Sequence, residues 1–268
     1  MKKQYSLEHR KFLRKLHLGV FGVHISRILV LIAIFALWEI VANIGVVDPF
    51  ITSSPSRIIK ALGELISTGN LFMHTWVTLY ETLLAFAIST IVGFLVAIVL
   101  YLITPLRKVF EPFLVVLNSL PKVALGPLII VWVGAGVKAT ITMGILICVI
   151  VTTISMLNGF LSVDTEKIKL LKTMGANNFQ ILFKLILPAS LPNIISVLKV
   201  NVGLAWVGVI MGEYLNSSAG LGYLIVYGGQ VFKLDLVMAA IIVLCLCASL
   251  MYFVIAGIEL YINKKRNI

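Results

Sequence analysis

Long apolar stretches alternate with short polar ones along this chain. Each apolar stretch is near the roughly 20 residues that a helix needs to cross the hydrocarbon core of a bilayer. Hydrophobic residues make up 60% of the 268, which excludes a soluble globular domain. The sequence therefore predicts an all-α, polytopic membrane protein with six transmembrane helices. We place them near residues 28–47, 77–103, 112–133, 139–160, 193–212 and 236–262.

The third apolar stretch is unusual because polar residues and helix breakers interrupt it. The interruptions are Asn118, Ser119, Pro121, Lys122, Gly126 and Pro127. Backbone groups freed by such breaks are tolerated at membrane depth only against protein or a water-filled cavity. We therefore expect a translocation pathway beside this stretch. Its predicted members are Asn118, Ser119, Pro121 and Lys122 here, with Asn201, Trp206 and Glu213 on the fifth span as further candidates.

Three ionisable residues, Glu39, Glu81 and Lys122, are assigned to the predicted spans. Charged groups are costly in lipid, so we expect them to face the bundle interior or water. The alternative for Lys122 is that it reaches the membrane surface or pairs with Glu39 or Glu81. For Trp206, packing is the more common role.

One segment, residues 164–192, is too polar for lipid and predicts two short helices with a break between them. Asp164 can cap the first helix, with Glu166 in its first turn, where the helix dipole favours negative charge. Gly175 is placed to end that helix in a left-handed conformation. The simplest alternative is an ordinary loop lying on the membrane surface.

Asn177 or Asn178 can cap the second short helix. Its apolar residues recur at helical spacing and predict one apolar face. Pro188 and Pro192 are expected to close the unit before the fifth span. The face consists of Phe179, Leu182, Phe183 and Ile186.

The net charge of +11 is distributed unevenly about the predicted spans. Six spans put both termini on one side, together with the basic turn at Arg107 and Lys108, the lysines of 164–192 and the cluster at 264–266. By the positive-inside rule that side is cytoplasmic. The first 26 residues are basic and amphipathic, which predicts an interfacial arm, with a solvated tail as the alternative. We expect a lipid bilayer, and no nucleic acid, as the partner of these charges.

Candidate catalytic chemistry is missing from the sequence. The cysteines Cys148, Cys245 and Cys247 lie in apolar runs and have no metal-ligand spacing, and the four histidines form no metal or acid–base set. No phosphate-binding loop or hydrolase motif is present. We therefore expect no enzyme activity, no metal and no cofactor in this chain.

Several motifs resemble a known transporter family. Gly175, Leu185, Leu187 and Pro188 stand at the spacing of the cytoplasmic coupling loop, or EAA loop, of ATP-binding-cassette (ABC) importer permeases. Further matches are similar to the nitrate/sulfonate/taurine class of these permeases. They are Leu120-Pro121-Lys122-Val123-Ala124, Pro127-Leu128, Trp132, Gly134-Ala135-Gly136, and Gly220-Leu221-Gly222-Tyr223 after Glu213.

The chain departs from the family pattern at two places. Residues 169–171 are Lys-Leu-Leu where the family has Glu-Ala-Ala, although Glu166 lies one turn earlier. In the second span the class tends to have Ser-x-x-Arg, and this chain has Thr78 and Glu81.

The resemblance implies a type I ABC importer permease fold in the bacterial inner membrane, with an arm at 1–26, a permease domain at 27–268 and a coupling loop at 161–192. It implies a homodimer of permeases, a cytosolic ATPase dimer that holds the ATP and Mg, and an external solute-binding protein. The solute would be a small oxyanion, a sulfonate or a vitamin precursor. The alternative is a stand-alone secondary transporter or channel. The residues expected to contact the ATPase are Asp164, Glu166, Lys169, Leu171, Gly175, Ala176, Phe179, Leu187 and Pro188.

Overall fold

The structure is a computed structural model that describes residues 7–45 and 52–265. The elements in these ranges are helices and none is a strand, which confirms the all-α prediction. The chain divides into two compact units, residues 1–63 and 64–268. Residues 1–6 of the predicted arm, residues 46–47 of the first predicted span and residue 266 of the predicted basic cluster lie outside the described residues.

The first unit is built on one long helix, α1 (Leu7–Ile44), which passes unbroken through residue 26, the expected end of the N-terminal arm. Its apolar part is Leu29–Ile44. The carboxylate of Glu39 accepts hydrogen bonds from the backbone N–H of Ser56 (3.0 Å) and from the Ser56 hydroxyl (2.8 Å). Ser56 lies in the first turn of α3 (Pro55–Ser67), where the helix dipole favours a negative charge. Glu39 therefore has its partner within this unit.

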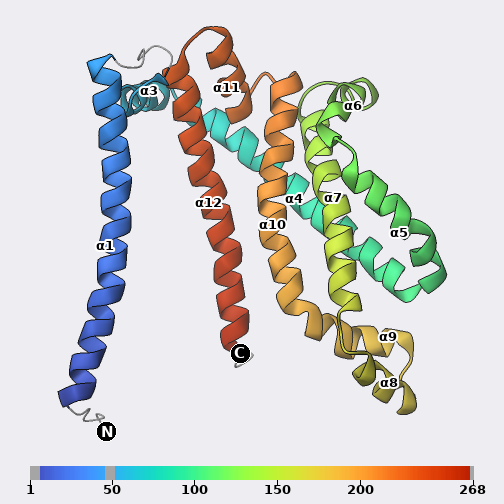
Figure 1. Ribbon diagram of the computed structural model, residues 1–268. Helices are drawn as coiled ribbons and strands as arrows, with labels where there is room; N and C mark the ends of the chain where they lie inside the picture. The colour runs from blue at the N-terminus through green and yellow to red at the C-terminus, as the bar shows by residue number, and fades with distance from the viewer. Residues whose placement is uncertain (1–6, 46–51, 266–268) are drawn as a thin grey trace. The chain divides into compact units, whose positions relative to one another are not determined.

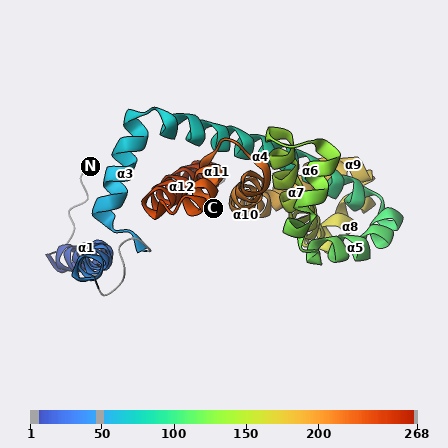
Figure 2. The ribbon, with the colours of Figure 1, turned by 90° about the horizontal axis from the view of Figure 1, so that it is seen from above.

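The second unit is a bundle of long apolar helices: α4 (Asn70–Leu102), α7 (Val137–Leu161), α10 (Leu187–Asn216) and α12 (Leu234–Lys265). Figure 1 shows α7 and α10 side by side with α4 crossing behind both, and Figure 2 shows α12, α10 and α7 in a row along α4. Small residues allow the close contacts. A Cβ on Gly208 would lie 2.6 Å from the Cα of Gly144, and one on Gly212 would lie 2.7 Å from the Cα of Thr140.

The interrupted third stretch is not one straight helix. It forms α5 (Thr104–Ser119), the short 3₁₀ helix η1 (Lys122–Leu125) and α6 (Gly126–Val133), with a bend of 86°. Leu120 is extended, as the residue before a proline prefers to be, so the helix ends ahead of Pro121. The breakers therefore turn the chain, as their presence in the apolar stretch suggested.

Four helices in the described ranges are long and apolar enough to cross a membrane, or five if the bent pair counts as one span. The predicted count of six is therefore not reproduced, because Leu29–Ile44 is a shorter apolar helix than the others. Between α10 and α12 lies α11 (Leu221–Gln230), which packs against both helices.

Candidate functional site

The polar segment after α7 folds as the sequence predicted in its first half. A side-chain oxygen of Asp164 accepts a 2.9 Å hydrogen bond from the N–H of Glu166 and so caps α8 (Thr165–Thr173). Gly175 follows with a φ of 84°, which glycine adopts without strain. The N–H of Gly175 donates to the carbonyl of Lys172 and that of Ala176 to the carbonyl of Leu171, both at 3.0 Å. These two bonds form a Schellman motif that ends the helix.

The second short helix, α9 (Asn178–Ile181), begins with a capping box. The Asn177 side chain accepts from the N–H of Gln180 at 2.8 Å, and the Gln180 side chain accepts from the N–H of Asn177 at 2.9 Å. Of the two asparagines that the sequence offered as caps, the structure uses the first.

The expected closure by Pro188 and Pro192 is wrong, because both residues lie inside α10. A π-helical turn, η2 (Leu182–Ile186), joins α9 to α10 without a break. Proline has no N–H to donate, and its ring collides with the carbonyl four residues back. The wider π turn directly before Pro188 relieves that conflict, so the helix continues.

The four apolar residues predicted to share one face are divided between two environments. Leu182 and Ile186 are fully buried and join a core cluster with Ala97, Leu157 and Phe160. Phe179 and Phe183 are instead 63% and 61% exposed. Leu170 and Met174 on and just after α8 are also exposed, at 60% and 75%. We call these four exposed side chains (Leu170, Met174, Phe179 and Phe183) the loop apolar set.

The residues predicted to contact an ATPase lie on this loop, and most of them are accessible. The half-buried ones are Leu171, Ala176 and Leu187. The exposed ones are Asp164, Glu166, Lys169, Gly175, Phe179 and Pro188.

The predicted translocation residues do not form one cluster. Asn118, Ser119 and Pro121 are exposed at the bend between α5 and η1. The amine of Lys122 donates to the carbonyl of Asn118 at 2.9 Å. Within the ranges that the structure describes, no ion pair joins Lys122 to Glu81, so the alternative pairing with Glu81 is not formed.

The other three pathway candidates are buried inside the bundle. The Asn201 side-chain amide donates to the hydroxyl of Thr152 at 2.6 Å and to that of Thr90 at 3.3 Å, which ties α10 to α7 and α4. Trp206 is 3% exposed and packs in a cluster with Val202 and Met251. These contacts hold the helices together, and the part of these residues in translocation stays a prediction.

Glu213 is 1% exposed and holds the start of α11. Its Oε2 accepts a 2.5 Å hydrogen bond from the N–H of Gly222. A Cβ on Gly220 would lie 2.3 Å from the Glu213 carboxyl carbon, and one on Gly222 would lie 2.7 Å from Oε2. The two glycines therefore make room for the carboxylate at the positive end of the helix.

Two side chains of α4 bind the same turn. The N–H of Gly220 donates to Nδ1 of His74 at 2.9 Å, and the N–H of Leu221 donates to the hydroxyl of Thr78 at 2.7 Å. The backbone N–H groups of residues 220, 221 and 222 are thus bound by buried side chains. We call this network, formed by His74, Thr78 and Glu213 around residues 220–222, the α11 anchor.

Glu81 extends the anchor. It is fully buried and its carboxyl group lies within hydrogen-bonding range of Glu213. Neither Glu81 oxygen, nor Oε1 of Glu213, receives a hydrogen bond from a donor among the described residues. Two carboxylates cannot donate to each other, so this contact is a hydrogen bond only when the pair holds a proton.

Sequence reasoning missed a pair of partly exposed charges between two helices of the bundle. Lys199 of α10 and Glu259 of α12 form an ion pair, and the Lys199 amine lies 5.9 Å from the centre of the Tyr252 ring. Both residues fall in the predicted spans 193–212 and 236–262, so Glu39, Glu81 and Lys122 were not the full set. The signal was available, because opposite charges on consecutive spans are expected to pair.

A bundle of long apolar helices with a polar helix–glycine–helix loop is the architecture of a multi-pass membrane protein. Residues 89–268, more than half of the chain, match the model of the family described as "Binding-protein-dependent transport system inner membrane component". The chain belongs to this family and is an ABC transporter permease subunit, as the sequence motifs indicated.

Named relatives agree with this assignment. A putative aliphatic sulfonates transport permease protein of Bacillus subtilis strain 168 is 29% identical over 87% of this chain and 85% of its own length. A probable ABC transporter permease protein of Haemophilus influenzae is 31% identical over 84% and 91%, respectively. The taurine transport system permease protein of Escherichia coli K12 is 26% identical over 82% of each.

A solved structure supports the fold. A chain of the inward-facing MetNI methionine ABC transporter superposes with a TM-score of 0.62 at 22% identity, covering 69% of this chain and 92% of that one. At this identity the similarity establishes the type I permease fold alone.

Proposed function

We propose that two copies of this chain form the pore of an importer driven by a cytosolic ATPase dimer, and that the loop at 161–192 is where the ATPase docks. ATP and Mg are held by that partner, and an external solute-binding protein delivers the solute. In this arrangement the loop and both termini are cytoplasmic, which agrees with the positive-inside distribution of charge.

The loop apolar set is the observation that carries this proposal. Surface residues are ordinarily polar in a charged loop, and clustered exposed aromatic and aliphatic side chains are typical of protein interfaces. Charged residues of the same loop, among them Lys169, Asp164 and Glu166, are also exposed. An ATPase groove would cover the apolar side chains and meet the charged ones at its rim.

The connection behind the loop supports a mechanical role. α9 continues through η2 into α10, and the buried side of this continuous helix packs on the ends of α4 and α7. A displacement of the loop is therefore passed to α10 rather than absorbed in a flexible joint. ATP binding would close the ATPases and rock the helices to open outward, and hydrolysis would reset them.

The proposed solute is a small oxyanion, sulfonate or vitamin precursor. The relatives are named for aliphatic sulfonates, taurine, formylaminopyrimidine and riboflavin. We place the pathway along the bend after α5, where Asn118, Ser119, Pro121 and Lys122 bring polar groups and free backbone to an otherwise apolar surface.

Co-purification with a co-expressed cassette ATPase tests the docking proposal. We expect Phe179→Ala to weaken the complex by about tenfold, because truncating a central aromatic residue at an interface commonly costs that much. Phe110→Ala on α5 removes an exposed phenylalanine away from the loop and serves as the control. Equal complex yields from wild type and both variants would remove the loop from the interface.

A further inference from the structure

A cavity of about 250 Å³ lies between the loop and the ends of two membrane helices. The last residues of α4 and α7 form one side of it, and Tyr101 packs edge-on against Phe160 there, with ring centres 6.1 Å apart. Residues of α8 and α9 form the other side. The cavity thus sits where the apolar helices end, which is the level of the membrane–water interface.

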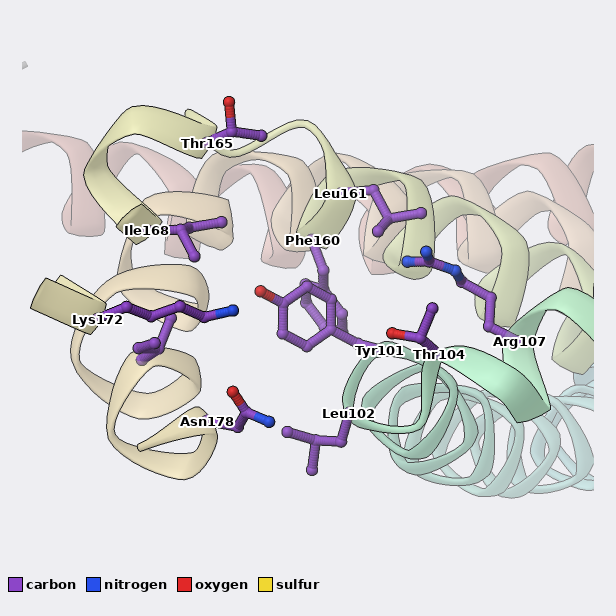
Figure 3. Close-up of a pocket in the computed structure, with 11 residues that line it drawn as sticks. Tyr101, Leu102, Thr104, Arg107, Phe160, Leu161, Thr165, Ile168, Lys172 and Asn178 are labelled. Atoms are coloured by element: carbon purple, nitrogen blue, oxygen red, sulfur yellow. The ribbon is translucent and has the colours of Figure 1, made fainter. Parts of the chain in front are cut away.

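The cavity is lined by two cations and by no carboxylate. Arg107 enters from the first turns of α5 and Lys172 from the last turn of α8. Figure 3 shows Lys172 reaching towards the Tyr101 ring from the loop side, while Arg107 lies on the α5 side of it. In the part of the chain that the structure covers, neither cation has a carboxylate within ion-pair distance.

Neutral donors complete the lining. The hydroxyl groups of Tyr101, Thr104 and Thr165 and the side-chain amide of Asn178 belong to lining residues. The N-terminus of α5 begins at Thr104, with no side-chain cap and no acidic residue in its first turn. Its free N–H groups and its dipole add positive potential on that side.

The carboxylates that are close to the lining residues in sequence do not line the cavity. Asp164 and Glu166 flank Thr165, and Glu111 lies one helical turn from Arg107 on α5, but none of the three is a lining residue. The Asp164 carboxylate is occupied as the cap of α8 and lines a different cavity, on the side of Pro192 and Asn193. Two cations and several donors thus line one small space without a carboxylate among the lining residues, and such groups bind oxyanions by charge-assisted hydrogen bonds.

We propose that this cavity binds a phosphate group, with Arg107 and Lys172 as its two charged ligands. A phosphate presents enough oxygens to accept donors from both walls, whereas one carboxylate has only two. The group can come from the headgroup of an anionic phospholipid at the interface or from free phosphate. The bound group would join α4, α5 and α7 to α8 and so brace the loop from its membrane side. This site does not depend on ATPase docking.

An experiment with two arms distinguishes a lipid headgroup from free phosphate as the source of the bound phosphate group. In the first, the purified chain is placed in nanodiscs of phosphatidylcholine with or without phosphatidylglycerol, and retained phosphatidylglycerol is counted by native mass spectrometry. In the second, inorganic phosphate is titrated into phosphatidylcholine nanodiscs, with chloride at matched ionic strength as the blank, and the thermal unfolding midpoint is followed. Retention in the first arm identifies a lipid, and a midpoint shift in the second identifies free phosphate.

Matched variants assign the site. Arg107→Gln and Lys172→Gln are each expected to weaken binding by about tenfold, because a charge-assisted contact is lost. Lys108→Gln and Lys169→Gln remove the same charge from neighbouring positions that do not line the cavity, and binding should change by less than about twofold. Arg107→Lys keeps the charge and should restore part of the affinity, which separates a lost ligand from a misfolded loop.

The outcomes are decisive for this site. Equal weakening by all four glutamine variants would show a diffuse charge effect and overturn the assignment. The assignment would also be overturned if the wild-type chain retained no phosphatidylglycerol and its thermal unfolding midpoint did not depend on phosphate. Binding without ATPase co-purification would refute the docking proposal alone, and docking without binding would refute the phosphate site alone.

Discussion

The two ends of the α4–α7–α10 bundle differ in which side chains are exposed and which are buried. At the loop end, the apolar side chains of Phe179 and Met174 are exposed and the charged groups are in solvent. At the α11 end, His74 and Glu213 are buried and bound to the backbone. Exposed apolar surface favours a partner, and buried side chains that are hydrogen-bonded to the backbone favour one fixed geometry. The comparison indicates that the first end is built to receive another protein and the second to hold α11 in place.

The largest effect should come from filling the α11 anchor. Gly220 has a φ of 114° and its added Cβ would lie 2.3 Å from the Glu213 carboxyl carbon. Gly220→Ala combines backbone strain with a buried collision, and we expect the free energy of unfolding in detergent to fall by about 3 kcal/mol.

Gly229→Ala is the control for that change. Gly229 lies in the same helix α11, has nothing within 4 Å of an added Cβ, and is exposed. Alanine should be neutral or slightly stabilising there. A Gly220→Ala protein as stable as the Gly229→Ala one would mean that the anchor is loose and that the contrast between the two ends does not hold.

Removing the anchor's acceptor should have the next largest effect. Glu213→Ala leaves the buried N–H of Gly222 without a partner, and we expect a loss of about 2 kcal/mol in unfolding free energy.

Glu81→Gln keeps the size of the side chain and supplies an amide N–H that can donate to Glu213. It should therefore retain most of the stability, whereas Glu81→Leu should not. Equal losses for glutamine and leucine at 81 would show that the contact with Glu213 is not a hydrogen bond.

The loop end should respond in function rather than in stability. Gly175 has a φ of 84° and open space around its Cα. Gly175→Ala costs about 1 kcal/mol of local strain and should fold normally. Gly175→Pro also removes the N–H that donates to Lys172 and fixes φ at a value incompatible with the turn.

We expect Gly175→Pro to separate ATP hydrolysis from transport in reconstituted vesicles, with hydrolysis retained and solute uptake reduced by roughly tenfold or more, since a misplaced docking element loses its geometry. Gly175→Ala is the matched control at the same position. Normal uptake by the proline variant would count against the loop as the mechanical connection.

Sequence reasoning was strongest where one local rule decides the structure. The Asp164 cap, the Gly175 turn and the helical breaks after Asn118 follow from nearest neighbours in the chain, and the structure confirms each. The prediction for Pro188 was wrong, because a π turn can accommodate a proline inside a continuous helix. The spacing of apolar residues does not reveal such a turn.

The division of the loop's apolar face also lay beyond the sequence. Phe179 and Leu182 have the same hydrophobic character, and only the packing of α4 and α7 decides which of them is covered. The α11 anchor likewise joins residues that are far apart in the chain. Long-range contacts of this kind cannot be derived from helical spacing.

The smallest effect is expected between the two ends, at the ion pair of Lys199 and Glu259. Both side chains are about a quarter exposed, at 21% and 26%. A double-mutant cycle with Lys199→Met and Glu259→Gln should give a small coupling free energy, as is usual for polar contacts between membrane helices. A coupling free energy several times larger would show that this pair fixes α10 to α12 as firmly as the anchor fixes α11. A coupling free energy near zero would show that the pair behaves like the solvated charges of the loop end. In that case α12 is held to α10 by apolar packing around Trp206 and Met251.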